Sequence, residues 1–176
     1  MAAESDFDRL WTPYRMSYIK GEGKPEHSGE GEQCPFCRAP GEQGEEDLVV
    51  AKGETVYAVL NKYPYNPGHL LICPYRHIAL YDEMTDEETT EFSAFTKTAM
   101  AVLSKTSVPG GFNIGMNQGA ISGAGIAAHL HQHVVPRWQG DTNFVSVIGG
   151  TRVLPQLLSQ TRDIVGAQWQ LQIQES

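Results

Sequence analysis

The segment 129–138, His-Leu-His-Gln-His-Val-Val-Pro-Arg-Trp, constrains the fold more than any other part of this chain. Three histidines, His129, His131 and His133, occupy every second position at its start. Side chains alternate between the two faces of a β-strand, so this spacing predicts a strand over 129–135 with all three imidazoles on one face. Because a buried imidazole is costly unless it has a polar partner, the segment predicts a functional site rather than plain core.

Two kinds of chemistry suit such a row of histidines. The imidazoles could bind a catalytic metal, or one of them could attack a phosphorus centre and carry the transferred group. Histidine titrates near neutrality, which leaves a neutral, nucleophilic fraction at cellular pH. The loop just upstream contains Gly119, Gly123 and Gly125. Such a loop can direct backbone N–H groups at phosphate oxygens, although it also suits an ordinary turn between strands.

The three cysteines do not suggest a disulfide framework. Their number is odd and the first residues contain no apolar signal-peptide segment, so the sequence predicts a cytoplasmic protein. Cys34 and Cys37 form a CxxC pair, which indicates zinc, a redox pair or chance. A closed zinc site would need two further ligands, for which the histidines are the candidates. Cys73 lies in an apolar run and is predicted to be core.

The hydrophobic pattern predicts an α+β fold, with antiparallel strands and one long central helix. Thr85 and Glu88 form a capping box at the start of that helix, whose apolar positions recur every three or four residues. Gly53 separates the first two strands as in a hairpin. Strands are expected over 48–51, 55–61, 69–73, 112–117, 129–135 and 145–148, a final helix from near 155 to about 169, and a loop without helical or strand periodicity over 21–47.

The charge excludes some classes of partner. With 13 basic and 21 acidic residues, the chain has a net charge of −8, which argues against nucleic-acid binding. No apolar run reaches the length of a membrane span. Residues 22–47 carry eight acids and two bases, and residues 82–91 carry six acids and no base. The remaining seven acids and 11 bases make the rest of the chain mildly basic, which suits an anionic small molecule.

The motif His-Leu-His-Gln-His-Val-Val resembles the signature of the histidine triad (HIT) superfamily. The block 59–74, Val-Leu-Asn-Lys-Tyr-Pro-Tyr-Asn-Pro-Gly-His-Leu-Leu-Ile-Cys-Pro, is similar to the fragile-histidine-triad branch. The resemblance implies a HIT-like fold with an N-terminal extension and acidic loop over 1–47, a HIT core over 48–138, and a C-terminal tail and helix over 139–176, all in one structural domain. The block 11–16 and the tail resemble actinobacterial HIT proteins described as diadenosine tetraphosphate phosphorylases.

The resemblance also implies roles for individual residues. The catalytic set would be His129, His131 and His133, with His131 as the nucleophile that takes the nucleotidyl group and His133 holding the phosphate and supporting the leaving group. Asn61 matches a ribose-contacting position, and His69 matches a histidine behind the triad. The polar residue that contacts the phosphate chain falls at Asn117, with Gln118 as its rival.

One position departs from the family pattern. Ile126 stands where the family often has a Ser or Thr whose hydroxyl contacts phosphate. We therefore expect Ser122, or backbone N–H groups between Gly123 and Gly125, to replace that contact. After the strand, Arg137 would offer charge to a distal phosphate or be solvated, and Trp138 would stack on a base or pack in the core or an interface.

The resemblance extends to the metal. HIT members with an early CxxC resemble zinc proteins whose remaining ligands would here be His77 and His129, completing a set with Cys34 and Cys37. Such a Cys₂His₂ set is closed and structural, which disfavours a catalytic metal. The alternative is a metal-free CxxC with His77 on the surface.

The resemblance implies an enzyme that cleaves dinucleoside polyphosphates, with phosphorolysis of diadenosine tetraphosphate to ATP and ADP favoured over hydrolysis. Two alternatives stay open: a Hint-like hydrolase of adenosine 5′-phosphoramidates and a non-catalytic nucleotide-binding protein. The family also implies a homodimer, with a tetramer as the alternative, and no organic cofactor.

Overall fold

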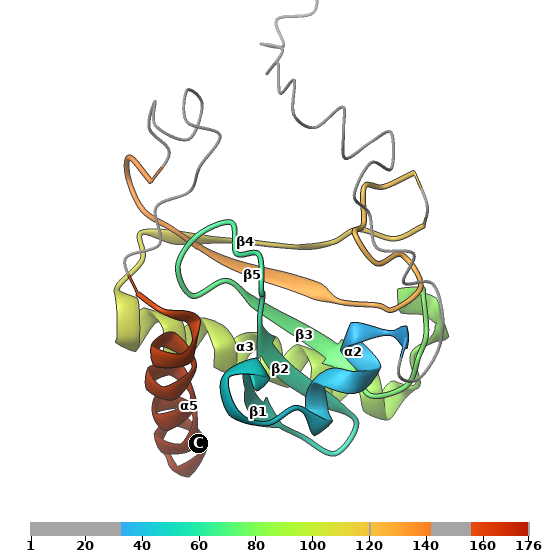
Figure 1. Ribbon diagram of the computed structural model, residues 1–176, viewed down its shortest axis with the longest axis horizontal. Coiled ribbons are helices and arrows are strands. Elements are labelled where there is room, and N and C mark those ends of the chain that lie inside the picture. The colour runs from blue at the N-terminus through green and yellow to red at the C-terminus, as the bar shows by residue number, and fades with distance from the viewer. Residues whose placement is uncertain (1–32, 120, 142–155, 176) are drawn as a thin grey trace, which may run out of the picture.

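The computed structural model describes residues 33–119, 121–141 and 156–175 (Figure 1). The block 11–16, the first part of the acidic loop and the expected strand over 145–148 lie outside these residues. None of the helices in the described ranges has the length and hydropathy needed to cross a membrane.

A five-stranded antiparallel sheet forms the centre of the described chain, in the order β1-β2-β3-β5-β4. The β1–β2 hairpin turns at Gly53, as the sequence predicts. The central strand β3 is buried along its whole length, and β5 pairs with it so that Leu71 lies opposite His133. The strands are β1 Val49–Lys52, β2 Val56–Leu60, β3 Leu70–Pro74, β4 Gly111–Met116 and β5 Gln132–Arg137.

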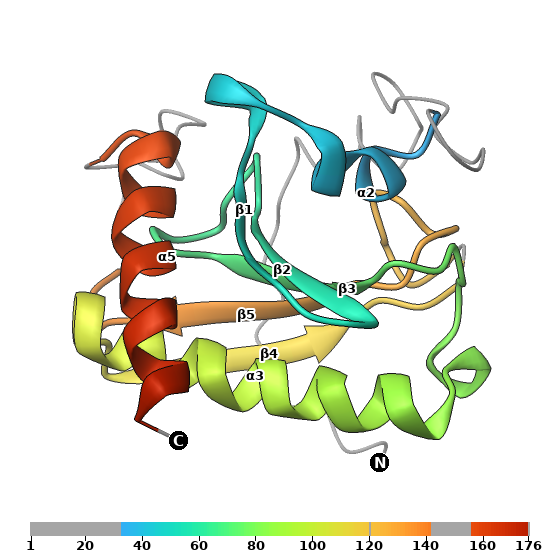
Figure 2. The same cartoon turned by 90° about the horizontal axis from the view of Figure 1, so that it is seen from below.

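Two helices complete the core. The long helix α3, Asp86–Ser107, begins with the predicted capping box, in which Glu88 N–H donates to Thr85 Oγ and the Glu88 carboxylate accepts from Thr85 N–H. It lies along one face of the sheet, whereas the short helix α2, Pro35–Arg38, lies over the other face (Figure 2). The C-terminal helix α5, Leu158–Gln174, packs on α3 and β1, where Trp169 meets Phe95.

The predicted α+β architecture is confirmed, with three differences in local structure. The described part of the acidic loop contains α2 and three-residue helical turns, because Pro35 suits the first turn of a helix and Arg38 N–H donates to Cys34 O. The last helix begins and ends a few residues later than expected. The strand predicted over 129–135 begins at Gln132 instead, because Leu130 N–H donates to Ile78 O and does not join the sheet.

Candidate catalytic histidines and metal site

Four side chains from three separate segments meet beside the start of β5. Cys34 is the N-cap of α2 and Cys37 lies within that helix, His77 follows β3, and His129 precedes β5. Their ligand atoms all lie within 4.8 Å of one another. Cys34 Sγ is 3.4 Å from His129 Nδ1, and Cys37 Sγ is 3.2 Å from His77 Nδ1. The structure thus brings together the four ligands expected from the resemblance, in positions that suit a metal ion.

The chemistry of this group fits zinc. Two thiols and two imidazoles are a common tetrahedral set for a structural zinc ion. The ring of His129 is fixed by a 2.9 Å hydrogen bond from its Nε2 to Pro74 O. A carbonyl oxygen only accepts, so Nε2 carries the proton and the lone pair on Nδ1 faces the thiols. Burial lowers the pKa of His129 to about 4, which keeps the ring neutral at neutral pH.

His131 has the opposite tautomer. Its Nδ1 donates a 2.8 Å hydrogen bond to His129 O, so the lone pair lies on Nε2. The side chain is 6% exposed and packs between the rings of Phe36 and His133. Burial also lowers the pKa of His131, which favours the neutral form that can attack an electrophile. Position, tautomer and charge of this imidazole are therefore suited to a nucleophile.

His133 is oriented by a chain of two hydrogen bonds. Tyr65 N–H donates to His69 Nδ1 at 3.0 Å, which puts the ring proton of His69 on Nε2. That Nε2 lies 2.9 Å from His133 Nδ1 and donates to it. The remaining nitrogen of His133, Nε2, is consequently an N–H donor. Burial lowers the pKa of His133 to about 4, and Tyr65 stacks on its ring with an interplanar angle of 15°.

Asn61 supports the turn between β2 and β3. Its backbone N–H donates to His69 O, and its Oδ1 accepts from Tyr63 N–H. The Nδ2 atom lies 3.4 Å from His69 Nδ1. Asn61, the predicted ribose contact, thus adjoins the His69–His133 pair.

A groove of about 450 Å³ runs from His133 along β5 and β4. Gly115, directly opposite His133 in the sheet, has open space where a Cβ would lie. Asn117 and Arg137 also line the groove. Two bonds join the Arg137 guanidinium to the Asp141 carboxylate, which balances its charge at the far end of the groove. Asn117 is thus the better placed of the two predicted phosphate-chain residues, because Gln118 Oε1 accepts from Tyr81 N–H.

The glycine-rich loop has a tight internal turn. Gly119 and Gly123 have positive φ angles, which favour glycine. The Ser122 hydroxyl donates to Gly119 O at 2.8 Å, so its proton is used within the turn. Gly125 is exposed and Ile126 is half-buried. This arrangement favours backbone N–H groups, rather than the Ser122 hydroxyl, as the hydrogen-bond donors to a phosphate.

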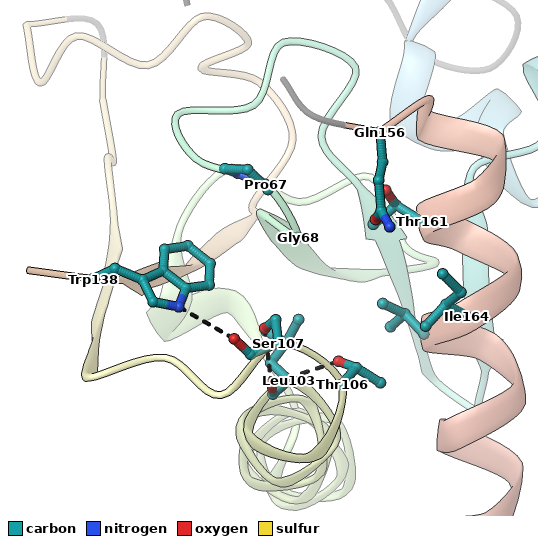
Figure 3. Close-up of a pocket in the computed structure, with 10 residues that line it drawn as sticks. Pro67, Gly68, Leu103, Thr106, Ser107, Trp138, Gln156, Thr161 and Ile164 are labelled. Carbon is teal, nitrogen blue, oxygen red and sulfur yellow. Dashed lines mark hydrogen bonds between the residues drawn. The ribbon is translucent and has the colours of Figure 1, made fainter. Parts of the chain in front are cut away.

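Trp138 lies away from the histidines. Its indole lines a separate cavity of about 410 Å³ between the end of α3 and the start of α5, together with Leu103 and Ile164 (Figure 3). The indole N–H donates to Ser107 O at 3.2 Å. Because the described residues that line this cavity include no histidine, Trp138 is not part of the proposed substrate site.

Two residues that contact the site were not singled out by sequence reasoning. Phe36 packs against both His129 and His131, and Tyr65 stacks on His133. Phe36 sits inside the CxxC motif, so its place next to a predicted metal was a usable signal. Tyr65 offered less, because turn aromatics serve packing and interfaces equally well.

Comparison with known proteins agrees with this geometry. A sequence profile described as the HIT domain matches residues 42–140. The chain belongs to the HIT family. This HIT protein is 50% identical over 164 residues to the protein named AP-4-A phosphorylase of Mycobacterium tuberculosis, an alignment that covers 92% of this chain and 84% of the relative. The expectation of a HIT-family enzyme resembling such phosphorylases is confirmed.

Solved structures share the fold. A zinc-bound histidine triad family protein from Mycobacterium smegmatis superposes with a TM-score of 0.65 at 22% identity, covering 81% of this chain and 97% of that one. Diadenosine triphosphate hydrolase from Plasmodium falciparum, in complex with Cyclomarin A, gives a TM-score of 0.55 at 17% identity, covering 77% and 80%. The predicted HIT-like fold is thus confirmed.

Proposed function

We propose that this HIT enzyme cleaves diadenosine tetraphosphate by phosphorolysis, through a nucleotidyl group carried on His131. The observation that carries the proposal is the pair of tautomers on two neighbouring rings: an unprotonated Nε2 on His131 and an Nε2–H donor on His133, which lines the groove. The 50% identity to a mycobacterial AP-4-A phosphorylase supports the choice of substrate.

The first step forms one bond and breaks another. The lone pair on His131 Nε2 attacks the α-phosphorus, and the bond from that phosphorus to the β-bridging oxygen breaks, releasing ATP and leaving an adenylyl group on the ring. The Nδ1 proton of His131 stays in place and donates to His129 O, which stabilises the positive charge that develops on the imidazole.

His133 serves the leaving group. Its Nε2–H donates to the departing oxygen, while His69 holds the other nitrogen as an acceptor. In the second step an inorganic phosphate oxygen attacks the adenylyl phosphorus, the phosphorus–nitrogen bond breaks, and ADP leaves. Asn117 at the groove and backbone N–H groups near Gly123 bind the phosphate chain, and Asn61 contacts the ribose.

We assign the Cys34–Cys37–His77–His129 group as a structural zinc site. Zinc held by these four side chains would cross-link α2, the segment after β3 and the residues before β5. His129 belongs to this group through its Nδ1, which faces the thiols, and its backbone carbonyl accepts from His131 Nδ1. The reaction itself is assigned to the side chains of His131 and His133.

We also propose a cytoplasmic homodimer. Its location rests on the cysteine pattern of the sequence. Pairing through β4 is supported by the position of that strand at an edge of the described sheet, where Ile114 is 41% exposed. Light scattering on the purified protein would give about twice the chain mass, whereas the monomer mass would refute the proposal.

The products formed with and without phosphate test the reaction. With isotopically labelled phosphate and diadenosine tetraphosphate, we expect ATP and ADP, with the label in the β-phosphate of ADP. Without phosphate, ADP should be absent. ADP formed equally in both cases would refute phosphorolysis. Faster turnover of adenosine 5′-phosphoramidate would instead favour the Hint-like alternative, and tight nucleotide binding without turnover would favour a binding protein.

A further inference from the structure

We propose that Phe36 is a positioning residue for His131, which connects the metal-binding loop to the attacking imidazole. The inference rests on the proposed function, in which His131 is the nucleophile. It concerns a residue that supplies no ligand to the metal-binding group and contacts the rings of both His129 and His131.

Phe36 covers one side of the His131 ring. The two ring centroids are 4.7 Å apart with an interplanar angle of 35°, and Phe36 also meets His129 edge-on at 5.5 Å. His133 packs against His131 from another direction, with centroids 5.1 Å apart and planes at 67°. The imidazole of His131 is therefore held between two rings, of which Phe36 belongs to the metal-binding loop.

Phe36 is held in place both by its neighbours in the chain and by a hydrogen bond from the sheet. It lies between Cys34 and Cys37, whose thiols belong to the metal-binding group. Its carbonyl oxygen accepts a 2.6 Å hydrogen bond from the hydroxyl of Tyr57, a fully buried residue of the central sheet. The wall that Phe36 provides is thus attached both to the metal site and to β2.

Contact with Phe36 limits the tilt of the His131 ring, which its single hydrogen bond does not. The bond from Nδ1 to His129 O fixes one edge of the imidazole, but the ring can still tilt about that edge. Nε2 lies on the far side of the ring, so a small tilt displaces the attacking atom. Because attack requires alignment with the bond that breaks, displacement by about 1 Å can cost about 100-fold in rate.

The test compares Phe36→Leu with a matched control. Leucine keeps an apolar side chain but removes the flat face, and Phe95→Leu removes an aromatic partner of Trp169 between α3 and α5, away from the histidines. Metal content, thermal midpoint, kcat and KM are measured for each. We expect Phe36→Leu to lower kcat about 10- to 100-fold at full metal content with KM within about twofold of wild type, and Phe95→Leu to leave both constants unchanged.

A second readout does not depend on turnover. In ¹⁵N-histidine-labelled, metal-loaded protein, the Nδ1 proton of His131 should exchange faster with water in Phe36→Leu than in wild type. If wild type does not turn over, the proposed function fails, and this exchange rate still decides the role of Phe36. Unchanged exchange and unchanged kcat would overturn the inference, as would a raised KM with normal kcat, which indicates contact with substrate.

Tyr57→Phe provides the test if Phe36→Leu loses its metal. It removes only the hydroxyl that donates to Phe36 O and leaves the metal-binding loop unaltered. At full metal content we expect a smaller fall in kcat, about threefold to tenfold, with KM unchanged. Wild-type kcat and wild-type exchange at His131 in this variant would overturn the inference.

Discussion

His129 and His131 stand two positions apart in the same motif, yet the structure gives them opposite tautomers. The Nε2 of His129 donates to Pro74 O, so its Nδ1 lone pair faces two thiols. The Nδ1 of His131 donates to His129 O, so its lone pair is on Nε2, beside His133. In the proposed function, the ring nitrogen that meets a backbone carbonyl therefore decides which histidine serves as a metal ligand and which as the nucleophile.

The two ends of the histidine motif also differ in how open their surroundings are. The Cys34–Cys37–His77–His129 group lies between α2 and the segments after β3 and before β5, and its four ligand atoms are close enough together to hold a metal ion. Beyond His133, the groove along β4 and β5 is open, with Gly115 leaving space at its floor. The histidine row is thus enclosed at its His129 end and open to the groove at its His133 end.

Exchanging His131 for alanine should produce the largest effect. His131→Ala removes the nucleophile, and we expect kcat to fall by about five or more orders of magnitude. Metal content and thermal midpoint should remain close to wild type, because the tautomer of His129 is set by Pro74 O. Steady-state kinetics with metal analysis measure both. Turnover near the wild-type rate would end the proposed mechanism.

His129→Ala should give the complementary result. It removes a metal ligand, so we expect loss of bound zinc and a lower thermal midpoint. Removing zinc from wild type with a chelator should have the same effect, because a ligand held at 1,000 times its Kd stabilises the fold by about 4 kcal/mol. Calorimetry with and without chelator measures this change. An unaltered midpoint and no zinc in the untreated protein would contradict the metal assignment.

His69→Leu should have an intermediate effect on rate. Leucine cannot donate to His133 Nδ1, so the proton of His133 is free to move to that nitrogen and the Nε2–H donor is lost. We expect kcat to fall about 100-fold, the usual range for a general acid, while metal content is retained. A kcat equal to that of wild type would show that the tautomer of His133 does not matter.

The smallest effect should be on stability at mildly acidic pH. Burial lowers the pKa of His133 to about 4 from its ordinary value of 6.5, so between these values the unfolded chain binds a proton that the folded chain excludes. The free energy of unfolding should therefore fall as pH drops from 6.5 towards 4. His133→Gln keeps an acceptor for His69 and removes this titration. Urea unfolding at pH 7 and pH 5 should show a smaller loss in the variant; an equal or larger loss would be inconsistent with the sign.

Much of the fold followed from local sequence patterns. Capping at Thr85 and the Gly53 hairpin depend on neighbouring residues, and both are present in the structure. The CxxC pair is visible in the sequence, but His77 and His129 were expected as its partners only from the family resemblance, and the structure brings the four side chains together. The start of β5 was not predicted, because it depends on the hydrogen bond from Leu130 N–H to Ile78 O, two residues far apart in the sequence. The internal bond of Ser122 and the cavity around Trp138 likewise depend on tertiary contacts that no periodicity encodes.

Trapping the covalent intermediate tests the division of tasks between the histidines most directly. Enzyme mixed with diadenosine tetraphosphate in the absence of phosphate, quenched in base and digested, would be mapped by mass spectrometry. The account predicts an adenylyl adduct on His131 in wild type and none in His131→Ala. An adduct on His129 or His133, or turnover without any histidine adduct, would contradict it.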